Sequence, residues 1–125
     1  MKETVKYDFR RLEAYVYGKE LVKEVYLLIN MFPKSEQFAL CDQLRRAIVS
    51  VPSNIAEGLG RFSDKEKVHF LEIAYGSLME AQCQLDIACD LGYFSKETLQ
   101  MIDTVIDREA RLISGLRAKY VKNDK

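Results

Sequence analysis

The sequence predicts an all-α fold made of four helices. Four segments carry apolar residues at the three- and four-residue spacing of an α-helix, and they cover residues 9–31, 36–59, 64–90 and 96–120. Short connections that contain Pro, Gly or Ser separate them, and no segment shows the alternating pattern of a β-strand. Because such short connections join neighbouring helices that run in opposite directions, we expect an antiparallel, up-down four-helix bundle.

Length and composition fit a single domain without a membrane span. A chain of 125 residues is long enough for one hydrophobic core and too short for two, so we assign residues 1–125 to one domain. The sequence has no run of about 18 apolar residues, and its charged N-terminus lacks the apolar part of a secretory signal. Three cysteines without CxxC spacing predict free, buried thiols in a reducing cytoplasm rather than a metal site or a catalytic thiol.

The first helix, residues 9–31, has an unusually broad apolar surface. From residue 21 onward its apolar residues cover roughly half of the circumference, whereas a helix that buries one face needs a stripe only slightly wider than about 100°. Two neighbouring helices account for part of this width, and contact with another subunit is the alternative. After Pro33, which fixes a turn, Ser35 is a candidate N-cap for a second helix that begins near residue 36.

The second helix, residues 36–59, contains a proline. Its apolar stripe consists of Cys41, Leu44, Ile48, Val51, Ile55 and Leu59. Pro52 removes one hydrogen-bond donor and crowds the carbonyl of Ile48, which ends or kinks a helix. Because the stripe keeps its phase across Pro52, we expect one helix that is kinked there.

The third and fourth helices have recognisable ends. Ser63 and Glu66 form an S-x-x-E capping box before the third helix, Gly92 suits the position after it, and Ser95 is a candidate cap for the fourth. The third helix has a main stripe of Leu71, Tyr75, Leu78, Leu85 and Cys89 beside a strip of Ala74, Ser77, Ala81 and Ala88. Since it is apolar or small over much of its circumference, we expect it to be the most buried helix.

A family resemblance rests on the stretch QLRRAIVSVPSNIAEGLGR at residues 43–61. It extends to LEAYVYGKELVKEVY, FPKSEQFAL and FLEIAYGSLMEAQCQLDIACDLGY, and together these pieces span roughly residues 9–120. The sequence resembles the small bacterial four-helix-bundle proteins encoded in intervening sequences of 23S ribosomal RNA genes. The resemblance implies an up-down bundle that assembles into a homo-oligomeric ring, typically a pentamer, and it supplies no defined biochemical activity.

The polar face of the second helix is the main candidate site. It comprises Arg45, Arg46, Asn54, Glu57 and Arg61. One interpretation is an architectural network in which Arg46 and Glu57, three turns apart, pair with other helices or chains. The other is a cluster of arginines that contacts phosphate. Asn54 and Glu57 also suit a tight subunit interface.

Charge is balanced overall and uneven along the chain. The sequence has 19 basic and 19 acidic residues, which makes a monomer a poor non-specific binder of nucleic acid. Residues 68–94 contain four acids and no Lys or Arg, whereas residues 108–125 contain six bases and two acids. The candidate nucleic-acid contacts of this last stretch are Arg108, Arg111, Arg117 and Lys119. They are poorly interleaved with aromatic residues, so base stacking is not indicated.

Glu109 interrupts the apolar stripe of the fourth helix, between Ile106 and Ile113. A buried carboxylate without a partner is costly. We therefore expect Glu109 to meet an arginine, Arg45 or Arg46 in particular, or to be wetted at a channel between subunits.

No pattern in the sequence predicts catalysis, a cofactor or a metal site. Glu66 and His69 have the E-x-x-H spacing of di-iron bundles, but a di-iron site needs a second such pair and the chain has one histidine. The sequence thus favours a non-enzymatic, ring-forming module that contacts RNA, a ribonucleoprotein or a nucleic-acid-processing protein. The alternative is a protein-binding adaptor without a nucleic-acid role.

Overall fold

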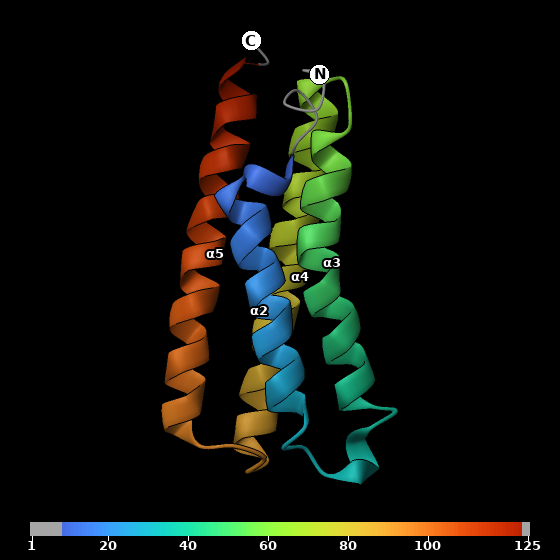
Figure 1. Cartoon of the computed structure of the whole chain (residues 1–125), viewed down its shortest axis with the longest axis vertical. Helices are drawn as coiled ribbons and strands as arrows, with labels where there is room; N and C mark the ends of the chain where they lie inside the picture. The colour runs from blue at the N-terminus through green and yellow to red at the C-terminus, as the bar shows by residue number, and fades with distance from the viewer. Residues whose placement is uncertain (1–8, 124–125) are drawn as a thin grey trace.

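Four long helices and two short 3-10 helices make up the computed structural model, which describes residues 9–123 (Figure 1). The α-helices are α2 (Glu13–Ile29), α3 (Leu40–Leu59), α4 (Asp64–Asp90) and α5 (Lys96–Asn123), and the 3-10 helices are η1 (Phe9–Arg11) and η2 (Lys34–Glu36). In Figure 1 the four α-helices lie side by side, and each runs opposite to the one before it. Within the described range there is no strand, and no helix has the length and apolar character to cross a bilayer. The remainder of the predicted domain, residues 1–8 and 124–125, lies outside the described residues.

The first predicted helix is shorter than expected. Leu12 has extended backbone angles (φ −72°, ψ 134°), so η1 is separated from α2, which starts at Glu13 rather than near residue 9. At the other end, the amide of Met31 donates to the carbonyl of Leu28 and that of Phe32 to Ile29, three residues back. The last turn therefore tightens beyond Ile29 instead of continuing as an α-helix.

The start of α3 also differs from the prediction. Residues from 34 to 36 form η2, and α3 begins at Leu40, because Ala39 has non-helical angles (φ −119°, ψ −99°). The N-cap position is Ala39 rather than Ser35, and its side chain makes no capping hydrogen bond. Glu36 Oε1 instead accepts a hydrogen bond from the amide of Leu40, the first residue of α3, at 3.3 Å. Its Oε2 accepts a 2.7 Å hydrogen bond from the hydroxyl of Tyr93, which ties this end of α3 to the α4–α5 connection.

Pro52 lies within α3, which continues as one helix from Leu40 to Leu59. A nearby backbone carbonyl, that of Ser50, accepts a 2.8 Å hydrogen bond from Asn54 Nδ2. The Ser50 hydroxyl also lies 2.8 Å from the hydroxyl of Ser77 on α4. Ser50 and Asn54 are each two residues from Pro52, so these hydrogen bonds lie within one turn of the position that lacks an amide hydrogen.

The predicted caps of the last two helices are confirmed. Ser63 Oγ accepts from the amide of Glu66 at 3.1 Å, and Ser95 Oγ accepts from the amide of Thr98 at 3.1 Å. Gly92 has a positive φ of 83° and ends α4, with Tyr93 N bonded to the carbonyl of Ala88 in a Schellman arrangement. The fourth helix ends at Asn123, three residues later than predicted.

The core is formed by one face of each helix, with two corrections for α4. Its buried residues are Leu71, Ala74, Leu78, Ala81, Gln84, Leu85 and Ala88. The small-residue strip thus faces the core, and Tyr75 is 37% exposed rather than part of the buried stripe. Nor is α4 the most buried helix: seven of its 27 residues are buried, against eight of 20 in α3. The reason is that the apolar residues of α4 extend onto its outer side, where Ile73 and Ile87 are exposed.

Candidate functional site

The polar residues predicted on the second helix do not form one cluster. Arg46 Nε pairs with Asp42 at 3.2 Å, one turn away on the exposed side of α3. Arg45 is half-buried beside Cys41; burial raises the pKa of that thiol, and the Arg45 charge opposes the rise. Asn54 is engaged with Ser50 of its own helix. The structure therefore distributes these side chains among separate local contacts.

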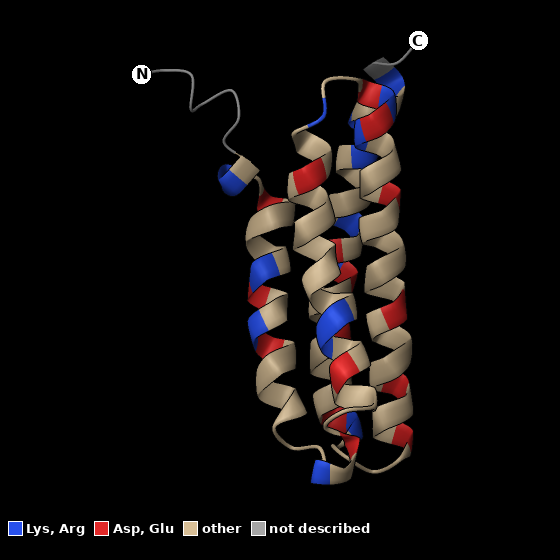
Figure 2. Ribbon diagram, turned by 90° about the vertical axis from the view of Figure 1, so that its right-hand side faces the viewer, with Lys and Arg blue, Asp and Glu red and all other residues tan. Residues whose placement is uncertain are grey.

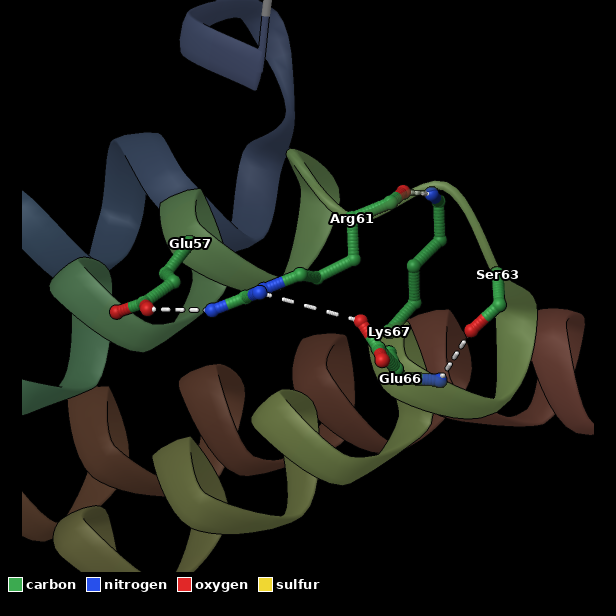
Figure 3. Close-up of polar contacts among 5 residues, drawn as sticks. All are labelled: Glu57, Arg61, Ser63, Glu66 and Lys67. Carbon is green, nitrogen blue, oxygen red and sulfur yellow. Dashed lines mark hydrogen bonds and ion pairs between the residues drawn. The ribbon is translucent and has the colours of Figure 1, made fainter.

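Arg61 and Glu57 do come together, at the turn between α3 and α4 (Figure 3). The guanidinium of Arg61 lies 2.9 Å from a carboxylate oxygen of Glu57 and 4.0 Å from one of Glu66. It also covers the ring of Phe70, with 4.6 Å between Cζ and the ring centroid. Lys67 Nζ donates to the backbone carbonyl of Arg61. Two helix ends are thereby joined by charged side chains, which supports the architectural interpretation for Arg61.

Gly58 explains why the turn can be so tight. A Cβ added at Gly58 would lie 2.7 Å from Cβ of Phe70 and 3.4 Å from the carbonyl oxygen of Lys67. Only a residue without a side chain lets α3 and α4 approach this closely. Gly58 is thus a packing requirement of the α3–α4 corner.

The candidate bases of α5 have several different neighbours. Arg108 stacks on Tyr17 of α2, with 3.8 Å from Cζ to the ring centroid. Arg111 pairs with Asp107 of its own helix at 2.7 Å, and Arg117 pairs with Glu72 of α4 at 2.6 Å. All these ion pairs are exposed, so each stabilises the fold by less than about 1 kcal/mol.

Aromatic and basic side chains meet at one end of the bundle, which the sequence did not predict. The ring centroid of Tyr120 lies 5.4 Å from Nζ of Lys119 and 5.9 Å from Nζ of Lys67, which comes from α4. In the adjoining turn, the ring of Phe62 is 94% exposed. The bases of the run RFSDKEK, residues 61–67, were visible in the sequence. Their proximity to α5 was not, because the two segments lie far apart along the chain.

Glu109 is the most unusual residue of the core. It is 0% exposed, and neither carboxyl oxygen has a hydrogen-bond partner in the described part of the chain. The predicted pairing with Arg45 or Arg46 is wrong. Instead the carboxyl faces α2 and α3: a Cβ added at Gly18 would lie 2.9 Å from Glu109 Oε2 and 3.5 Å from Cβ of Pro52.

The protonation of Glu109 follows from this burial. Removal from water raises the pKa of its carboxyl from 4.5 to about 8, and the positive charge of Arg108 opposes the rise only in part. The side chain is therefore mainly a neutral acid at neutral pH. Among the described residues no group of His, Cys, Asp and Glu is arranged to hold a metal ion.

Comparison with known proteins places this geometry in a family. The model of the family described as 23S rRNA-intervening sequence protein matches residues 10–115, which is most of the chain. The chain belongs to the 23S rRNA-intervening sequence protein family. The residues matched by the family model include the α3–α4 corner, Glu109 and Gly18. Arg117, Lys119 and Tyr120 lie beyond the matched range.

A solved structure shares the fold of this family member. It is a protein of unknown function from the S23 ribosomal protein family of Bacteroides thetaiotaomicron, 20% identical in sequence, with a TM-score of 0.70. The similarity covers 94% of this chain and 99% of that one. No curated protein matches the chain.

Proposed function

We propose that this protein is a non-enzymatic scaffold that assembles into a homo-oligomeric ring, a pentamer, and contacts RNA or a ribonucleoprotein. The observation that carries the RNA contact is the meeting of basic and aromatic side chains at the end where the α3–α4 turn adjoins the C-terminal part of α5 (Figure 1). We call this surface the basic end, and it comprises Arg61, Phe62, Lys65, Lys67, Lys119 and Tyr120.

The chemistry of the basic end suits a flexible strand. Phe62 offers an open ring face on which a base can stack, and Lys67 and Lys119 flank the ring of Tyr120 with positive charge for phosphates. Arg117 is held near this end by Glu72, and because such exposed pairs are weak, phosphate can replace the carboxylate. A ring would repeat the basic end once per copy, which offsets the zero net charge of each chain.

Salt-dependent binding of single-stranded RNA tests this proposal. We expect affinity to fall as salt rises, with a slope of about −0.7 per phosphate contact. Lys119→Ala should weaken binding and reduce the slope by about 0.7, whereas Phe62→Ala should cost about 1–3 kcal/mol with little change in slope. Fluorescence anisotropy with a labelled RNA measures both quantities.

Lys96→Ala is the matched control, because Lys96 is exposed at the start of α5, at the opposite end of the bundle (Figure 1). Equal losses for Lys96→Ala and Lys119→Ala would show that binding is not confined to the basic end. No binding even at low salt would contradict the RNA contact altogether.

A protein-binding adaptor is the second candidate function, and the surface of α2 favours it. Tyr26, Leu27 and Met31 are 41%, 70% and 59% exposed, and this part of α2 adjoins grooves on both sides. An apolar partner helix would bind there with little dependence on salt. Binding of a partner that survives high salt, in the absence of RNA binding, would favour the adaptor.

We also infer three features of the architecture and its setting. The antiparallel course of consecutive helices supports an up-down topology for the single domain, and Pro52 inside α3 supports a kink there. The three cysteines are free, in keeping with a reducing cytoplasm, although only Cys41 is buried as predicted, and Cys83 is exposed.

A further inference from the structure

The outer side of α4 combines exposed apolar residues with an acidic one. Ile73, Glu80 and Ile87 follow one another at seven-residue intervals and therefore lie on one face of the helix. The two isoleucines are 38% and 44% exposed, and Glu80 is exposed between them. Figure 2 shows no basic position on α4 below its first turns. We call this surface the outer α4 face.

A glycine on α4 strengthens the case for an interface. Gly76 lies one turn from both Ile73 and Glu80 and is exposed, and in the described part of the chain no atom lies within 4 Å of an added Cβ. Neither the bundle nor the backbone angles require glycine here, and inside a helix glycine costs about 0.5–1 kcal/mol relative to alanine. Close approach of another backbone is a physical reason for such a residue.

A groove with the complementary character lies between α2 and α3. It has a volume of about 470 Å³, and its floor includes Val22, Val49 and Pro52. Lys19 and Lys23 of α2 line it, and none of the lining residues within the described range is a carboxylate. In Figure 2 the charges of α2 are on the side of the bundle opposite to α4. We call this surface the α2–α3 groove.

The two surfaces lie at similar heights along the bundle. Gly18 of α2 faces Pro52 of α3, since an added Cβ would lie 3.5 Å from Pro52 Cβ. Ser50 of α3 is bonded to Ser77 of α4 at 2.8 Å. Pro52 is two residues after Ser50 in α3, which runs upward in Figure 1, so Ser50 lies about 3 Å below Pro52. Ser77, which is bonded to Ser50, therefore lies about 3 Å below the level of Gly18.

Lys23 and Glu80 reach the same level from these two reference points. Both α2 and α4 run downward in Figure 1. Lys23 is five residues past Gly18, and Glu80 is three residues past Ser77. At 1.5 Å per residue each lies about 7.5 Å below Gly18. Rotation about an axis parallel to the bundle, without a shift along it, therefore keeps Lys23 of one copy level with Glu80 of the next.

We propose that the outer α4 face of one copy docks into the α2–α3 groove of a second copy, with Glu80 paired to Lys23. This inference rests on the proposed self-association and specifies its contact surfaces. The apolar residues of the α4 face meet the apolar floor of the groove, and Glu80 meets Lys23. Because the two surfaces differ, the contact is head-to-tail, and its repetition closes a ring when the rotation allows it.

Charge reversal tests the pairing, with mass measured by size-exclusion chromatography and light scattering across a dilution series. Lys23→Glu and Glu80→Lys should each raise the concentration at which the assembly dissociates by at least about tenfold. The double variant Lys23→Glu/Glu80→Lys should restore assembly. Lys96→Glu, an exposed charge reversal away from both surfaces, should leave it unchanged.

Cross-linking provides a second measurement. Cys83 is exposed one turn from Glu80, so a short bismaleimide should link Lys23→Cys to Cys83 of the neighbouring copy. Covalent ladders should form with Lys23→Cys and disappear with Lys23→Cys/Cys83→Ser, and Lys96→Cys should give none.

The outcomes separate this contact from self-association itself. A wild-type protein that is monomeric at all concentrations would overturn both the proposed contact and self-association. A wild-type oligomer that ignores the charge reversals and gives no Cys83-dependent ladder would overturn the contact and leave self-association standing.

Discussion

Glu109 shows how one buried residue can govern the response of the fold to pH. Its pKa is about 8 in the folded chain against an ordinary value of 4.5. Below pH 4.5 the carboxyl is protonated in both states, and its burial then costs least. Between these two values the unfolded chain ionises while the folded chain does not, so stability falls as pH rises by at most about 1.4 kcal/mol per unit.

We predict that Glu109→Gln removes most of this pH dependence. The amide has the size of the acid and no charge, so the variant should gain stability over the wild type from pH 5 to pH 8. Urea unfolding at several pH values measures the difference. Glu20→Gln, at an exposed position of α2, is the control and should keep the wild-type profile. Wild-type stability that is constant between pH 5 and 8 would contradict a buried neutral acid.

The residue that meets Glu109 was outside the reach of sequence reasoning. The periodicity of α5 correctly placed Glu109 in the core, because burial follows from the helical spacing alone. Its neighbours depend on the rotation and height of α2 and α3, which no local pattern specifies. Gly18 was therefore not identified, and Arg46, one of the two arginines expected as partners, pairs with Asp42 instead.

At the scale of the helix pair, the α3–α4 corner depends on Gly58. A methyl group there would collide with Cβ of Phe70, an atom fixed to the backbone, so the two helices would have to separate. We predict that Gly58→Ala destabilises the fold by about 1–3 kcal/mol. Gly115→Ala is the matched control, since an added Cβ meets nothing within 4 Å. It should stabilise the fold by about 0.5–1 kcal/mol.

Thermal or urea unfolding of the two alanine variants measures both effects. A Gly58→Ala chain as stable as the wild type would contradict the close packing of α3 against α4 at this corner.

Element boundaries were predictable where the signal is local. The caps at Ser63 and Ser95 and the end at Gly92 depend on residues within one turn, and the structure confirms them. The predicted start of α3 was wrong: Glu36, whose carboxylate accepts from the first amide of α3, is also bonded to Tyr93, which lies 57 residues away. The orientation of α4 was misjudged because apolar residues occur around most of its circumference.

At the basic end, too, only contacts between residues close in the sequence could be predicted. Arg61 was identified from its own segment, and its partner Glu57 is one turn away. Lys67 and Lys119 come from different helices and meet only because α4 and α5 pack side by side. The prediction that aromatic residues are poorly interleaved with bases was true of the sequence and does not hold in space.

At the scale of the whole molecule, Gly76 tests the proposed contact without altering charge. In an isolated chain Gly76→Ala and Gly115→Ala are equivalent, since both glycines are exposed and have open space around them. If the outer α4 face docks against another copy, Gly76→Ala should weaken assembly, whereas Gly115→Ala should not. Light scattering on dilution compares them. Equal masses at every concentration would argue against close approach at Gly76.

The buried acid has a consequence for the folding reaction as a whole. Near neutral pH the carboxyl of Glu109 is ionised in the unfolded chain and protonated in the folded one. Each chain that folds must therefore take up close to one hydrogen ion from the solvent, which the buffer has to release. The heat of unfolding should then differ between buffers according to their own heats of ionisation, and folding in unbuffered solution should make it measurably more alkaline.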